Sequence, residues 1–175
     1  MGRSGQATWP PSHRDRDTGR VNPRVESVTR QLREAGVAGE VRILEMKAHT
    51  AALAAEQLGI EVGAIANSLI FDADCAPLLV MTSGAHRVDT AKVAALLGIV
   101  TLRRADPDFV RRHTGQSIGG VAPIGHPEPI GTLVDIELAR YAEVWAAAGH
   151  PSTVFPTTYA ELLRITSGTA AEVGN

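Results

Sequence analysis

Residues 118–126 read IGGVAPIGH, a stretch that concentrates three glycines and a proline between a helix-like segment and a strand-like segment. A surface turn needs one or two such residues, so we infer that something approaches this backbone closely. Gly119 to Pro123 form a G-x-x-x-P pattern, whose consecutive N–H groups can point at one anion or at a carbonyl gaining negative charge. From the pattern alone, a β-bulge or a tight crossover is the competing interpretation.

The composition of the whole sequence limits the classes of protein to which it can belong. The 175 residues are 44% hydrophobic, which predicts one folded, soluble domain. A net charge of −2 and a pI of about 6.3 argue against a generally basic nucleic-acid binder, although a local basic patch is compatible with both. The single cysteine, Cys75, excludes an intrachain disulfide and suits a reducing compartment. No membrane-length apolar run or secretory signal is found, so we expect a cytoplasmic protein without a membrane partner.

Three parts of the chain are expected. Residues 1–22 are polar and rich in Arg, Gly and Pro, and they predict a flexible tail. Residues 23–168 form the domain, and residues 169–175 are expected to be a second, dispensable tail. Cap residues and apolar periodicity predict helices over residues 23–36, 51–59, 88–98, 106–115 and 159–166.

Strand signals alternate with these helices. Residues 65–74 and 77–84 are two apolar runs separated by a polar turn, which predicts a hairpin of buried strands. Further strands are expected over residues 41–46, 99–103, 132–138 and 152–158, and a short helix running into a strand over 141–147. Hairpin-type and crossover-type neighbours both occur, so the pattern favours a mixed sheet surrounded by helices.

The usual catalytic constellations are missing from the sequence. The six histidines are scattered without an i, i+4 pair, and neither a metal site nor a cofactor is predicted. Cys75 lies in an expected turn without a basic neighbour, which indicates an inert thiol. Ser83 ends an expected strand, a position where ligands often approach; a structural turn is the competing interpretation. No nucleophile elbow, Walker A motif or dinucleotide loop occurs.

Two segments together resemble a known family. Residues 119–126 resemble the G-x-x-x-P loop of the YbaK/ProX family of aminoacyl-tRNA editing domains, and residues 63–71 (GAIANSLIF) look like its signature strand, I-x-K-[ST]-L. The segments at 88–98, 105–108 and 157–163 match the family's layout in order. The resemblance covers roughly residues 24 to 168.

The resemblance implies a fold, a site and partners. The fold is mixed α/β, with a central mixed, partly barrel-like sheet surrounded by helices. Family members hydrolyse amino acids wrongly attached to tRNA, often in trans beside an aminoacyl-tRNA synthetase, without a protein nucleophile, metal or cofactor. The substrate's own ribose hydroxyl orients the water. Ser68, at the signature's [ST] position, is expected to contact the substrate. The loop expected to hold the ester carbonyl maps to Gly119, Gly120, Val121, Ala122 and Pro123.

Asn67 departs from the family pattern, because it stands at the lysine position. Asparagine can donate a hydrogen bond but contributes no charge. Loss of a desolvated cation near a developing oxyanion costs on the order of several kcal/mol, similar to loss of one oxyanion-hole donor. Either Lys47 or Arg87 supplies the charge instead, or the protein binds its ligand without cleaving it.

Other polar residues are candidates for ligand contacts. His49, at an expected helix start, is a candidate substrate contact. His126 is a candidate contact or proton relay near neutral pH, the alternative being an exposed residue after a turn. Two basic pairs could hold tRNA phosphates, the alternative being a solvated helix surface; they are Arg103 with Arg104, and Arg111 with Arg112.

Three functions follow from these observations. The first is a trans-acting deacylase for tRNA mischarged with a small amino acid, namely alanine, serine, cysteine or threonine. The second is a binding or regulatory protein that keeps the cleft without the chemistry, as Asn67 suggests. The third, favoured by the acidic net charge, is a small-molecule-binding α/β domain with no link to RNA.

Overall fold

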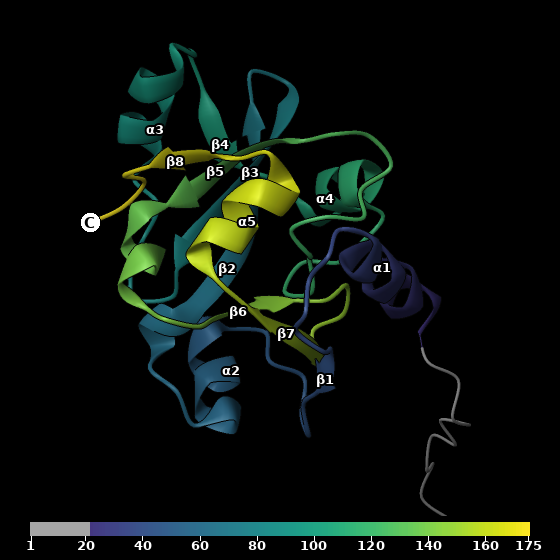
Figure 1. The fold of residues 1–175 in the computed structure, drawn as a ribbon. Helices are drawn as coiled ribbons and strands as arrows, with labels where there is room; N and C mark the ends of the chain where they lie inside the picture. Colours follow the sequence, from purple (N-terminus) through teal and green to yellow (C-terminus); the bar gives the residue numbers. More distant parts are fainter. Residues whose placement is uncertain (1–21) are drawn as a thin grey trace, which may run out of the picture.

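A computed structural model describes residues 22–175 of the chain (Figure 1). The predicted N-terminal tail, residues 1–22, therefore lies outside the described residues except for Asn22. Within the described part, no helix combines the length and the apolar character needed to cross a bilayer.

One mixed sheet of eight strands organises the chain. From edge to edge the order is β1-β7-β6-β2-β3-β5-β8, and β4 pairs with β2 off this path. The pairs β2–β6, β3–β5 and β5–β8 are parallel and the others antiparallel, which confirms the predicted mixed α/β class. The strands are β1 Arg42–Ile43, β2 Ile65–Ala73, β3 Ala76–Ser83, β4 Leu102–Arg104, β5 Gly131–Asp135, β6 Val144–Ala147, β7 Thr153–Thr157 and β8 Thr169–Ala171.

Five α-helices of residues 22–175 surround the sheet, and each begins at a residue whose side chain caps it. The cap side chains of Asn22, Thr50, Asp89, Asp106 and Thr158 each accept a hydrogen bond from a backbone N–H in the first turn. These local signals explain why the predicted helices are confirmed. The helices are α1 Pro23–Glu34, α2 Ala51–Leu58, α3 Thr90–Leu97, α4 Pro107–Thr114 and α5 Tyr159–Thr166, with 3-10 turns η1 Val62–Ala64 and η2 Ile136–Arg140.

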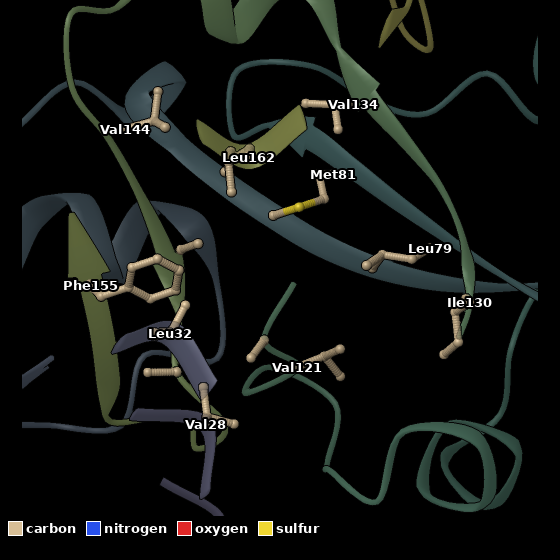
Figure 2. Close-up of a cluster of buried hydrophobic side chains, with 14 of the residues drawn as sticks. Val28, Leu32, Leu79, Met81, Val121, Ile130, Val134, Val144, Phe155 and Leu162 are labelled. Atoms are coloured by element: carbon tan, nitrogen blue, oxygen red, sulfur yellow. The ribbon is translucent and has the colours of Figure 1, made fainter. Parts of the chain in front are cut away.

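Both faces of the central strands are buried. Leu79 and Met81 of β3 belong to a cluster that includes residues of α1 and α5, as Figure 2 shows. Leu78 and Val80, the alternating residues of the same strand, join Val93 of α3 in a second cluster. The hydrophobic core therefore holds β2 and β3 rigidly from two sides, and the candidate site is built on these strands.

Strand β2 has an opening along one edge. Strand β3 pairs with its whole length, but on the other side β6 pairs only with Ile65 and Ala66, and β4 only with residues 71–73. Ile65 O accepts from Gly84 on the β3 side at 2.8 Å, whereas Ile70 O accepts from Ala105 on the other side at 3.2 Å. Because peptide groups alternate in direction along a strand, the N–H and C=O of Ser68 face the opening between β6 and β4.

Two local predictions need correction. The strand expected over 41–46 shrinks to β1, because Leu44 N–H bonds to Ser152 O at the sheet edge while Met46 N–H bonds to the Gln57 side chain. The helix expected at the start of 141–147 does not form. The 3-10 turn η2 precedes that segment instead, because the Asp135 side chain ends β5 by accepting from Glu137 N–H.

The segment 169–175 is part of the folded domain, so its prediction as a dispensable tail is wrong. Thr169–Ala171 form β8 beside β5, and Val173 is fully buried in the second cluster. Asp89 N–H donates to Val173 O at 2.8 Å, which ties the segment to the start of α3. Only two apolar side chains of this segment reach the core, which is too weak a pattern to predict a strand.

Candidate active site

Two adjoining chambers lie beside the opening in β2. The smaller has a volume of about 40 Å³, and alanines from α2, β2, β6 and the loop before α2 supply much of its wall: Ala48, Ala51, Ala54, Ala66, Ala146 and Ala147. The larger, of about 200 Å³, extends toward β4 and α4 and includes Arg104, Val110 and Ile118 in its wall. The two chambers share one wall, which consists of His49, Thr50, Ala51, Asn67, Ser68, Gly119 and Val121.

The glycine-rich loop supplies one side of this shared wall. Gly120 N–H donates to Ser117 O at 3.0 Å, which closes a turn, and Gly119 adopts the left-handed conformation with a φ of +86°. Gly120 packs against the backbone of His150, where a Cβ would lie 2.6 Å from the carbonyl carbon. The close approach inferred from the sequence is therefore partly a contact between two backbone segments of the protein, at Gly120 and at His150.

Two side chains fix the far end of the loop. Gln116 Oε1 accepts a hydrogen bond from Ala122 N–H at 2.7 Å, and His126 Nε2 donates one to Ala122 O at 2.9 Å. Gln116 is only 2% exposed, and its Nε2 also donates to Ile124 O at 3.4 Å. Sequence reasoning missed Gln116, because a glutamine six residues before its partner follows no helical or strand period.

The loop's N–H groups consequently fall into two sets. Those of Gly120 and Ala122 are bonded within the loop region. Those of Gly119 and Val121 donate to no other residue within 22–175, and both residues line the two chambers. The G-x-x-x-P loop therefore has two alternating N–H groups without a partner among residues 22–175, and both belong to residues that line the chambers.

Strand β2 supplies the opposite side of the wall. Asn67 and Ser68 line both chambers, and Asn67 pairs with Thr82 of β3 in the sheet register. Ser68 Oγ is buried and lacks a hydrogen-bond partner, which is true of no other buried side-chain nitrogen or oxygen in the described part of the chain. An unpaired buried hydroxyl costs about 1–3 kcal/mol, so a ligand that bonds to it recovers that free energy.

The ionisable side chains at the cleft are basic. His49 lines both chambers and Arg104 lines the larger one, whereas no carboxylate among the described residues lines either chamber. Lys47 is exposed beside them. Burial lowers the pKa of His150, and the charges of Lys47 and His49 lower it further. The cleft is therefore electrostatically suited to an anionic or ester ligand. Residues 22–175 contain no group of three potential metal ligands.

Three predicted site residues lie elsewhere. Ser83 is fully buried and donates to Gly63 O at 2.8 Å, so its hydroxyl serves the fold. Arg87 is exposed next to the C-terminal segment, where its carbonyl accepts from Asn175 N–H. His126 lines neither chamber and instead lines a separate cavity between the loop and α1. Burial lowers the pKa of His126, and the bond to Ala122 O partly opposes this shift.

The two arginine pairs do not form one patch at the cleft. Arg104 lines the larger chamber. Arg103 bonds to Asp72 at 3.3 Å, and Arg111 bonds to Asp108 at 3.4 Å on the exposed side of α4. Arg112 is exposed on the same helix. Of helix α4, Val110 lines the larger chamber, whereas Arg111 and Arg112 line neither chamber.

Comparison with known proteins gives consistent results. A family described as "Aminoacyl-tRNA editing domain" matches residues 45–165. The uncharacterised protein YwhH of Bacillus subtilis (strain 168) is 30% identical over 124 residues, 70% of this chain and 78% of YwhH. The proline–tRNA ligase of Limosilactobacillus fermentum (strain NBRC 3956) is 34% identical over 96 residues, 52% of this chain but 17% of the ligase. The chain thus corresponds to a small part of such ligases.

Solved structures share the whole architecture. A crystal structure described provisionally as a trans-editing enzyme for prolyl-tRNA synthetase superposes with a TM-score of 0.83 at 38% identity, covering 89% of this chain and 99% of the other. The hypothetical protein APE2540 superposes with a TM-score of 0.79 at 25% identity, covering 85% of this chain and 99% of the other.

Proposed function

Since the chain belongs to the aminoacyl-tRNA editing domain family, we propose that it is a trans-acting deacylase. Its substrate is a tRNA mischarged with a small amino acid: alanine, serine, cysteine or threonine. The observation that carries this proposal is the pair of unequal chambers with one shared wall of polar groups. The smaller chamber takes the amino-acid side chain, the larger takes the terminal nucleoside, and the ester lies at the wall between them.

The loop then supplies the electrophilic side of the reaction. The free N–H groups of Gly119 and Val121 hold the ester carbonyl as it gains negative charge on attack by water. Removal of one such donor typically costs about 10²–10³ in kcat. As the family resemblance implies, the substrate's ribose hydroxyl orients the water, and no nucleophilic side chain is needed.

The remaining polar groups bind the nucleic acid. Asn67 donates a hydrogen bond where a lysine would supply charge. Lys47 brings positive charge to the same rim, and the His49 imidazole contributes a further polar contact there. Arg104 contacts the terminal nucleotides from the larger chamber, and Arg103, Arg111 and Arg112 extend the contact to phosphates. The protein partner is a synthetase that mischarges the tRNA, since relatives include proline–tRNA ligases.

The small chamber limits the size of the amino acid. Its alanine-rich wall leaves a volume of about 40 Å³. In such a pocket, the discrimination between two substrates that differ by one methylene is about 1–3 kcal/mol. The four small amino acids fall within the range that such a chamber can discriminate. A side chain as large as that of leucine or phenylalanine does not fit without displacement of the alanines.

Asn67 favours a second candidate function, binding of the aminoacylated end without hydrolysis. The two candidates are distinguished by deacylation of alanyl-, seryl-, cysteinyl- and threonyl-tRNA, measured for the wild type and Asn67→Lys side by side. Turnover of any of the four by the wild type supports the deacylase. Activity confined to Asn67→Lys supports binding without chemistry, and inactivity of both proteins on all four tRNAs at high enzyme concentration rejects the deacylase.

A further inference from the structure

We propose that the opening in β2 at Ser68 binds the α-amino group of the aminoacyl ester, and that the protein thereby selects esters of amino acids whose amine is free. The inference rests on the proposed function, because it assigns a group of that substrate to a place in the same cleft. It adds a substrate class, since N-acylated aminoacyl esters and peptidyl esters are excluded.

The first argument is the concentration of unpaired polar groups on one residue. Ser68 Oγ is buried without a hydrogen-bond partner among residues 22–175. The N–H and C=O of Ser68 face the gap between Ala66, where the pairing with β6 ends, and Phe71, where the pairing with β4 begins. A ligand at this point meets two acceptors within one residue, the carbonyl oxygen and the hydroxyl, beside the donor N–H of the same residue.

The second argument is chemical complementarity across the shared wall. The loop side offers N–H donors at Gly119 and Val121, which suit the ester's carbonyl oxygen. The β2 side offers the Ser68 acceptors, which suit a donor. Of the groups of an aminoacyl ester, the α-amine carries the most donors.

The third argument concerns charge. Neither chamber is lined by a carboxylate among the described residues, so an ammonium group finds no counter-ion and depends on neutral oxygen acceptors. Those within the shared wall include the Ser68 carbonyl and hydroxyl, placed next to the loop that holds the ester. An acylated nitrogen has fewer donors, no basicity and extra bulk, so it loses these bonds.

The test uses 3′-aminoacylamino-3′-deoxyadenosine analogues, in which an amide replaces the ester so that binding is measured without hydrolysis. Alanyl analogues with a free amine and with an N-acetylated amine are titrated calorimetrically into the wild type, Ser68→Ala and Ser68→Thr. The wild type is expected to bind the free amine at least roughly tenfold more tightly, the equivalent of one good hydrogen bond. Ser68→Ala is expected to reduce this ratio severalfold, and Ser68→Thr, which keeps the hydroxyl, to preserve it.

A matched control and a modified ligand complete the design. Ser27→Ala removes a serine hydroxyl from α1, outside both chambers, and is expected to leave the ratio unchanged. A 2′-deoxy version of the free-amine analogue tests whether Ser68 contacts the ribose instead. The effect of Ser68→Ala is expected to persist with this ligand, and its disappearance would overturn the assignment to the amine.

Two further results would overturn the inference and leave the deacylase intact: equal affinity of the wild type for both analogues, or an equal loss for both in Ser68→Ala, in a protein that still hydrolyses aminoacyl-tRNA. Failure of the wild type to bind either analogue or to hydrolyse any aminoacyl-tRNA would reject the proposed function together with the inference.

Discussion

Gln116 Oε1 accepts a hydrogen bond from Ala122 N–H at 2.7 Å, and this contact joins a buried side chain to the loop that faces the cleft. Because Ala122 N–H is bound from behind, it cannot turn toward a ligand. The neighbouring N–H of Val121, whose side chain packs in the core cluster of Figure 2, has no partner among residues 22–175, and Val121 lines both chambers. The conformation of the loop at the cleft thus depends on a residue that lies outside the cleft.

Replacement of Gln116 is expected to impair hydrolysis more than stability. In Gln116→Ala, Ala122 N–H loses its acceptor, at a cost of about 1–3 kcal/mol in the free energy of unfolding. The loop then loses the contact that holds the conformation in which the Gly119 and Val121 N–H groups are free to bind a ligand. We expect kcat/KM for deacylation to fall by about 10–100-fold. Gln116→Glu, which keeps an acceptor at Oε1, is expected to recover part of the loss.

Gln31→Ala is a matched control, because Gln31 is a glutamine that lines the cavity behind the loop and bonds to Ser27. Its kcat/KM is expected to match that of the wild type. Wild-type kcat/KM in a folded Gln116→Ala would contradict the positioning role.

Gly120→Ala is expected to disturb both the loop and the fold. Its Cβ would lie 2.6 Å from the His150 carbonyl carbon, so one of the two backbones must move, which costs about 1–3 kcal/mol. A lower melting temperature in calorimetry and a loss of deacylation are expected together. Gly131→Ala serves as the comparison, because no atom lies within 4 Å of a Cβ built there; equal stability of the two variants would refute the close contact.

Filling the small chamber is expected to change the preference among amino acids. Ala147 of β6 lines this chamber, and valine is well suited to a strand. In Ala147→Val the rate for threonyl-tRNA, relative to alanyl-tRNA, is expected to fall by about tenfold or more. Ala76→Val, at an exposed position in β3, should leave the ratio of the two rates unchanged. An equal loss of rate for both substrates in Ala147→Val would contradict the assignment of the substrate's amino-acid side chain to this chamber.

The stability of the protein is expected to fall in acid partly through His126. Burial lowers the pKa of His126 from its ordinary value of 6.5, so the unfolded chain takes up this proton first as pH decreases. Between the folded pKa and about 6.5, the unfolded state binds more protons, and stability therefore falls with decreasing pH through that window.

Urea unfolding of the wild type and His126→Gln at several pH values between about 5 and 7.5 measures this effect. The variant is expected to show the shallower pH dependence, although His150, whose pKa is also lowered, remains. His113→Gln, on α4 away from the loop, is the control. Superimposable profiles of wild type and His126→Gln would contradict the role assigned to burial.

Local signals made much of the fold predictable. Thr50 and Asp106 cap their helices through contacts with residues three positions away, and contacts over so short a range can be predicted from the sequence. The β2–β3 hairpin was predictable for the same reason, since its two apolar runs flank a short turn. The C-terminal strand β8 was not predictable, because its partner β5 lies more than thirty residues away and the only apolar side chains that the segment buries are those of Ala171 and Val173.

The candidate site, like the fold, was predictable only in part. Asn67, Ser68 and the glycine loop were found from motifs, and they do share a wall. Gln116 and the displacement of His126 behind the loop depend on how the loop folds on α1, which no local pattern specifies. The unpaired edge at Ser68 depends on where β6 stops and β4 starts, and both boundaries are set by tertiary packing.

The opening in β2 also bears on aggregation. An unpaired strand edge in a protein usually invites another strand to add to it. Here the free edge covers only residues 67–69, because β6 and the bond from Ala105 to Ile70 O before β4 close it at its two ends, so an intermolecular strand of ordinary length cannot dock there. The chain can therefore keep unsatisfied peptide groups available to a small ligand without offering a template for self-association.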